Sequence, residues 1–148
     1  MGRLAGIARR ERKRAPMETL ERAEISTATG VAMDFRGKPG LRQVTVISAK
    51  AWREACSELQ RDIPWTTRRA NLLVDDVELP QTVGTVLSIG PVRLQITGEV
   101  DPCSRMDEQC PGLRQALQPE WRGGVSCTVL EGGTVVLGDE VTAEPSGH

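Results

Sequence analysis

Apolar and polar side chains alternate along several short stretches of the chain, and this period of two is typical of half-buried β-strands. Residues 42–47 alternate polar and β-branched side chains. Residues 83–89 and 92–97 repeat the alternation on either side of Gly90 and Pro91, a pair that interrupts strands. The pattern predicts one strand at 42–47 and a β-hairpin over 83–97.

A second hairpin is predicted closer to the C-terminus. Residues 126–130 and 134–137 flank Gly132 and Gly133, and paired glycines can adopt the positive φ angles of tight turns. A further turn at 138–139 precedes a short strand. Strands at short intervals joined by glycine-rich turns predict a mainly β fold, namely an antiparallel β-barrel with a few peripheral α-helices.

Two segments have the helical period instead. Ser48 is a candidate N-cap, and the apolar residues after it recur at helical spacing, which predicts a helix from about Ala49 to Gln60. These apolar residues are Trp52, Ala55, Cys56, Leu59 and Ile63. Pro111 favours the start of a shorter helix that buries Leu113 and Leu117.

Length and composition agree with one globular domain. The chain has 148 residues, of which 39% are hydrophobic and 26% charged, close to globular averages. We therefore expect a single domain over residues 1–148 with a flexible tail at 144–148. No apolar stretch is long enough for a secretory signal or a membrane span, which predicts a cytoplasmic protein.

The net charge of −1 does not indicate a polyanion binder. Basic side chains nevertheless crowd residues 3–14. This cluster favours a solvated strand end and loop, and it leaves a basic nucleic-acid-binding module as an alternative function. Aromatic residues make up only 3% of the chain, too few for a platform that stacks bases, so we do not expect a nucleic-acid partner.

The four cysteines are Cys56, Cys103, Cys110 and Cys127, and without an export signal we expect reduced thiols. No CxxC pair occurs, and the one histidine is His148, which argues against a zinc site. Cys56 and Cys127 lie in apolar-patterned elements and are expected in the core. Cys110 either caps the following short helix or acts as a resolving thiol for Cys103.

Cys103 is the strongest candidate for chemistry. Pro102 restrains the residue before it to an extended conformation, which predicts a loop at the end of the strand that closes near Thr97. Arg105 follows two positions later, and a nearby cation favours the thiolate. We expect Cys103 to be the most reactive of the four thiols, with an ordinary buried side chain as the alternative.

Arg69 and Asn71 form a second candidate pair. If residues 72–74 begin a strand, both side chains project from the same face. A guanidinium beside an amide suits a phosphate or a heterocycle with hydrogen-bonding groups, although a surface pair at a strand edge would show the same spacing.

Short motifs recur along the chain in a fixed order. They are Gly30-Val31 with Asp34, Arg42-Gln43-Val44, Arg69 to Val74, Gly84, Leu87 to Gly90, Pro102-Cys103, Gly132-Gly133 and Gly138-Asp139. In this order they resemble the MOSC domain, the C-terminal module of molybdenum cofactor sulfurases, which is also found in the mitochondrial amidoxime-reducing component. The resemblance covers about Leu4 to Thr142.

The resemblance implies a barrel-like fold and a cysteine, Cys103, that either ligates molybdenum or carries sulfur. It also implies that Arg69 and Asn71 hold polar groups of the pterin cofactor in one pocket with Cys103. Ser48 corresponds to a strand-end cofactor contact, where the start of a helix would favour a phosphate.

Two departures from the family pattern matter. Residues 33–36 read Met-Asp-Phe-Arg where members often have Gly-Asp-x-His. We also expect no separate N-terminal barrel of the kind that helps to enclose the pterin in larger relatives, so a bound cofactor would be more exposed or would need a partner.

Two functions follow from the resemblance, and the residues leave both open. In the first, the protein binds the molybdenum cofactor (molybdopterin), Cys103 is the metal ligand, an electron-transfer partner supplies electrons, and N-hydroxylated compounds are the candidate substrates. In the second, Cys103 accepts sulfur from a cysteine desulfurase, a pyridoxal phosphate enzyme, and delivers it as a persulfide to a metal centre. The missing barrel favours the carrier, whereas Arg69 and Asn71 favour the cofactor.

Overall fold

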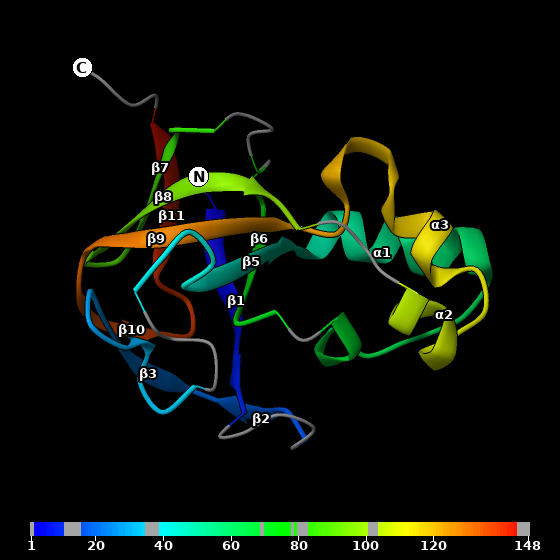
Figure 1. Cartoon of the computed structure of the whole chain (residues 1–148), viewed down its shortest axis with the longest axis horizontal. Helices are drawn as coiled ribbons and strands as arrows, with labels where there is room; N and C mark the ends of the chain where they lie inside the picture. The colour runs from blue at the N-terminus through cyan, green and yellow to red at the C-terminus, as the bar shows by residue number, and fades with distance from the viewer. Residues whose placement is uncertain are drawn as a thin grey trace.

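A computed structural model of the chain describes residues 2–10, 16–34, 39–68, 70–77, 79, 83–100 and 104–144. Strands hold more of these residues than helices do, and they wrap around one another at one end of the molecule (Figure 1). The three α-helices gather at the other end (Figure 1).

The strands are β1 (Gly2–Arg9), β2 (Glu18–Leu20), β3 (Arg22–Ser26), β4 (Gly30–Val31), β5 (Val44–Ser48), β6 (Leu72–Asp75), β7 (Val86–Ile89), β8 (Val92–Glu99), β9 (Val125–Glu131), β10 (Gly133–Val136) and β11 (Glu140–Glu144). The α-helices are α1 (Ala49–Leu59), α2 (Ser104–Gln109) and α3 (Leu113–Leu117). Two short 3-10 helices are η1 (Trp65–Arg68) and η2 (Pro119–Trp121).

The main sheet closes into a barrel. Its strand order is β11-β7-β8-β9-β5-β6-β1-β2, and β11 also pairs with β1, with Gly2 opposite Val141. Seven strands therefore form the ring, and β2 extends it. All of these pairs are antiparallel except β5 with β6, which α1 connects as a parallel crossover. The predicted mainly β barrel with few helices is confirmed, with one parallel pair in it.

Local patterns predicted several elements correctly. The β7–β8 hairpin pairs Ile89 with Val92 across Gly90, whose φ is 53°. Helix α1 begins and ends where its apolar residues predict, and Gln60 closes it in the left-handed conformation. Helix α3 buries Leu113 and Leu117 completely. Helix α2 was not expected from the sequence.

The second predicted hairpin is wrong. Strands β9 and β10 both form, but β9 pairs with β5 and β8, whereas β10 leaves the barrel and pairs with β3. Neither Gly132 nor Gly133 has a positive φ. A Cβ at Gly132 would lie 2.5 Å from the carbonyl oxygen of Ile25, so the glycine allows close approach to β3 instead of a tight turn.

Two apolar clusters stabilise the two ends of the molecule. One fills the barrel with side chains from nearly every strand, and the other packs α1, α2 and α3 against Ile47 and Ala70. Strand β5 contributes to both, because Val46 faces the barrel and Ile47 faces the helices. Within the described ranges, no helix is long and apolar enough to cross a membrane.

Candidate functional site

A cavity of about 300 Å³ lies between the first half of α1 and the turn that follows α3. The end of β5 and helix α1 contribute one wall with Ser48, Lys50, Ala51 and Glu54. The turn contributes the other wall with Glu120, Trp121 and Arg122, while Leu79 and Val125 complete the lining. Segments that are far apart in the sequence therefore meet at the junction of the barrel and the helices.

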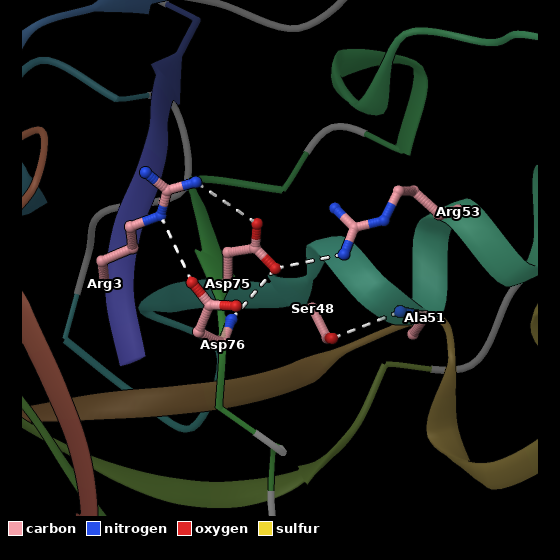
Figure 2. A network of polar contacts seen from close by, with 6 residues as sticks. All are labelled: Arg3, Ser48, Ala51, Arg53, Asp75 and Asp76. Carbon is pink, nitrogen blue, oxygen red and sulfur yellow. Dashed lines mark hydrogen bonds and ion pairs between the residues drawn. The ribbon is translucent and has the colours of Figure 1, made fainter. Parts of the chain in front are cut away.

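Ser48 ends β5 and caps α1. Its backbone is extended (φ −84°, ψ 130°), and its Oγ accepts a hydrogen bond from the amide of Ala51 at 3.2 Å (Figure 2). The predicted N-cap is confirmed. The first amides of a helix have no partner within the helix, and its dipole favours an anion at this end. Ser48 lines the cavity, and its role as a cofactor contact stays a prediction.

Ion pairs fix the edge of the barrel from which α1 starts. Asp75, at the end of β6, accepts a hydrogen bond from Arg53 of α1 at 3.2 Å and lies 3.7 Å from Arg3 of β1 (Figure 2). The hydrogen bond from the Arg53 guanidinium lowers the pKa of Asp75, and the backbone amide of Asp76 adds to the effect. These contacts hold α1 at a defined position on the barrel.

The turn after α3, which begins with η2, forms the opposite wall of the cavity and has an unusual backbone. Glu120 and Trp121 have φ angles of 50° and 55°, in the left-handed region, where an L-residue other than glycine costs about 1–2 kcal/mol. Hydrogen bonds hold the turn: the amide of Arg122 donates to Pro119, and the amide of Gly124 donates to Trp121 at 2.9 Å. Trp121 also packs against the barrel core.

Arg122 ties this turn to α1. Its Nη2 lies 3.4 Å from Glu54, and its Nη1 donates to Glu58 and to the carbonyl of Ala116. Its Nε is buried and has no hydrogen-bond partner among the described residues. Lys50 and Glu120 also line the cavity, and neither forms an ion pair in the part of the chain that the structure describes. The charges of these two side chains are therefore available to a ligand.

Arg68 is a structural residue that the sequence analysis missed. It is buried in η1, and its guanidinium donates to the carbonyls of Gly123 at 3.0 Å and Val100 at 2.8 Å. The amide of Val100 in turn donates to Gly124 at 3.0 Å. Arg68 therefore joins the end of β8 to the strand that lines the cavity. The arginine pair at 68–69 was the only signal in the sequence, and burial could not be inferred from it.

Asn71 has a different environment from that of Ser48. It is 4% exposed; its Oδ1 accepts from the backbone amide of Thr45 at 3.1 Å, and its Nδ2 donates to the carbonyl of Ala8 at 3.2 Å. Asn71 thus connects β5 and β1 at the start of β6, whereas Ser48 pairs with Val74 further along β6. The predicted cofactor contact of Asn71 stays a prediction.

Arg69 and Cys103 lie outside the described residues, so their expected meeting in one pocket with Asn71 remains a prediction as well. The other three cysteines, Cys56, Cys110 and Cys127, lie within the described residues. Cys127 is fully buried, and burial raises the pKa of its thiol to about 12. Cys110 is buried in the helical cluster, and Cys56 packs partly buried against it.

The described basic residues near the N-terminus are largely engaged by the fold. Arg9 donates to Glu18 at 3.3 Å and to the carbonyl of Ala32 at 2.9 Å. Arg10 is only 5% exposed, so the expectation of a solvated cluster is wrong for this residue. Among the described residues, no group of three histidine, cysteine or acidic side chains could hold a metal ion.

The protein is a seven-stranded mixed barrel with helices at one end and a polar cavity where the barrel and the helices meet. Residues 33–142 match the MOSC domain family, a span of more than half of the chain, and the chain belongs to this family. A search of curated protein sequences gives no match.

Solved structures confirm the fold. The YuaD protein of Bacillus subtilis is 18% identical, with a TM-score of 0.80 over 99% of this chain and 98% of the other. YiiM of Geobacillus stearothermophilus is 13% identical, with a TM-score of 0.76 over 97% of this chain and 75% of the other. YiiM of Escherichia coli is 14% identical, with a TM-score of 0.70 over 98% and 72%, respectively.

Proposed function

We propose that this MOSC protein binds the molybdenum cofactor in the cavity beside α1, with Cys103 as the thiolate ligand of the metal. The observation that carries the proposal is the position of the cavity next to the segment that leads to Cys103. Val125 lines the cavity, and the preceding residue, Gly124, accepts a hydrogen bond from Val100. Cys103 follows Val100 by three residues, which limits their Cα separation to about 11 Å.

The residues of the cavity fit a pterin that carries one phosphate. Its volume of about 300 Å³ is at the lower end of small-molecule sites, which range over roughly 300–1,000 Å³. Lys50 and the first amides of α1 would hold the phosphate, with Arg69 as a further proposed contact. Trp121 offers an apolar ring for the heterocycle. When bound, the metal would supply two-electron redox chemistry, for which N-hydroxylated compounds are the candidate substrates.

The proposal is tested by producing the protein in a host that makes the cofactor. Molybdenum is measured by elemental analysis, and the pterin by its fluorescence after oxidation. Wild type is expected to hold both in stoichiometric amounts. Lys50→Ala should retain at least several-fold less pterin, because a phosphate would lose its cationic partner. Arg22→Ala changes an exposed cation on β3 and serves as the matched control.

Cys103→Ser separates the metal ligand from the pterin site. This variant should retain the pterin, since the proposed pterin contacts are unchanged. The metal would still be held by the dithiolene sulfurs of the cofactor, but it would lose its protein thiolate, which X-ray absorption at the molybdenum edge detects as one sulfur ligand fewer. Wild type that holds neither metal nor pterin would contradict the proposal. If such protein instead formed a persulfide on Cys103 with a cysteine desulfurase, the sulfur-carrier function would replace it.

A further inference from the structure

Four charged side chains line the cavity, and two of them compensate each other. Arg122 lies 3.4 Å from Glu54, so this pair contributes little net charge to a ligand. Lys50 and Glu120 remain, and each is without an ion pair among the described residues. Lys50 belongs to α1 and Glu120 to the turn after α3, so the positive and negative charges come from opposite walls.

The turn that presents Glu120 is held in place from several directions. The amide of Gly123 donates to Leu117 at 3.1 Å, and Arg68 donates to the carbonyl of Gly123 at 3.0 Å. Arg122 anchors the turn to α1, and Trp121 packs against the barrel. These contacts fix the backbone that carries Glu120 and the position of the Trp121 ring, so a ligand would have to order only the exposed Glu120 side chain.

A free carboxylate can only accept hydrogen bonds, and its two oxygens suit two adjacent N–H donors. A flat heterocycle that carries such donors could also lie against the Trp121 ring. A ligand that satisfies both walls therefore has an N–H donor edge at one end and an anionic group at the other. Pterins have this donor edge, formed by the exocyclic amino group and the neighbouring ring N–H.

We propose that Glu120 binds the donor edge of the pterin ring and that Trp121 packs against its face, with the anionic end of the ligand toward Lys50. This assignment rests on the proposed cofactor site. Glu120 is then the residue that determines which heterocycle is bound. The orientation places the ring on the turn after α3 and the phosphate beside α1.

Two small heterocycles test this assignment without metal or phosphate. The probes are free pterin and lumazine, in which a carbonyl replaces the exocyclic amino group. Equilibrium dialysis against purified protein measures the dissociation constant of each. Wild type should prefer pterin by about tenfold, the effect of one well-formed hydrogen bond. Glu120→Gln should abolish or reverse the preference for pterin. The side-chain amide of glutamine can donate to the carbonyl of lumazine and accept from its neighbouring N–H.

Matched variants separate recognition from folding. Glu24→Gln removes an exposed carboxylate on β3 and should leave the preference unchanged. Trp121→Phe should bind both probes within a few-fold of wild type, whereas Trp121→Leu should weaken both by about tenfold, because only the first keeps an aromatic face. A merely structural role for Glu120 would change both affinities equally and leave their ratio intact.

The outcomes distinguish this assignment from the cofactor function. A wild-type protein that holds molybdenum and pterin but shows no preference between the probes, or does not bind them, overturns the role of Glu120 and leaves the cofactor function standing. A preference that Glu120→Gln retains also overturns it. In the third outcome, Glu120→Gln loses the preference for pterin, but the wild-type protein never acquires molybdenum. This result supports the heterocycle site and contradicts the role of Cys103 as a metal ligand.

Discussion

Arg122 and Glu54 join the two walls of the cavity, with Arg122 Nη2 3.4 Å from Glu54 Oε2. The side chain of Arg122 is 13% exposed, whereas that of Glu54 is 42% exposed. A mostly buried guanidinium thus spans from the turn after α3 to the wall of the cavity that α1 contributes. Both residues line the cavity, although they are 68 positions apart in the chain.

Replacing Arg122 by alanine should lower the free energy of unfolding by about 1–2 kcal/mol, because the carbonyl of Ala116 loses its donor and two carboxylates lose their cation. Urea unfolding measures the change. Arg93→Ala is the matched control, since Arg93 and Glu131 form an exposed pair at 3.8 Å. Its cost should stay below about 0.5 kcal/mol. Equal costs for the two variants would contradict the structural role of Arg122.

Asp75→Asn should destabilise the protein at neutral pH by about 1 kcal/mol or less, because both arginine partners are exposed. The pKa of Asp75 is lowered in the folded state, so its stabilising effect is complete above the unfolded pKa of about 3.9. It is lost as the pH falls through the folded value. Unfolding curves of wild type and variant should therefore converge in acid. Asp76→Asn, which removes a more exposed partner of Arg3, should show a smaller difference.

Asn71→Ala should cost about 2 kcal/mol of stability, because the amide of Thr45 and the carbonyl of Ala8 would stay buried without this partner. Thermal or urea unfolding in the absence of any ligand measures it. Thr19→Ala, at an exposed position of β2, provides a comparison with little expected cost. Unchanged stability of the Asn71 variant would contradict this structural role.

Limited alkylation at neutral pH should modify Cys103 before the other thiols. Cys127 should stay unmodified in the folded protein, because its pKa is raised to about 12 and the thiolate is the reactive form. Cys110 is 3% exposed and should also react slowly. Peptide mapping identifies the modified residue, and unfolding in urea should make all four accessible. Early labelling of Cys127 would contradict both its burial and the assignment of Cys103.

Several parts of the fold could be predicted because their cause is local. The alternation of residues 92–97 places Val92, Leu94 and Ile96 inside the barrel, and the stripe from Trp52 to Leu59 forms the buried face of α1. Ser48 was predictable as a cap because its hydroxyl bonds an amide only three residues away. In each case the signal lies within a single element, as a period of two along a strand, the helical period along α1, or a cap three residues from its partner.

The amino-acid sequence by itself determined the mainly β character, helix α1 with its cap, and the family. Only the tertiary structure decided that β10 pairs with β3, that β1 closes the barrel on β11, and that Arg122 meets Glu54 across 68 positions. Pairings of this kind depend on which distant backbones approach closely enough to bond, and periodicity carries no information about that choice. The cavity belongs to this second group because its two walls come from segments that meet only after the barrel and the helices pack together.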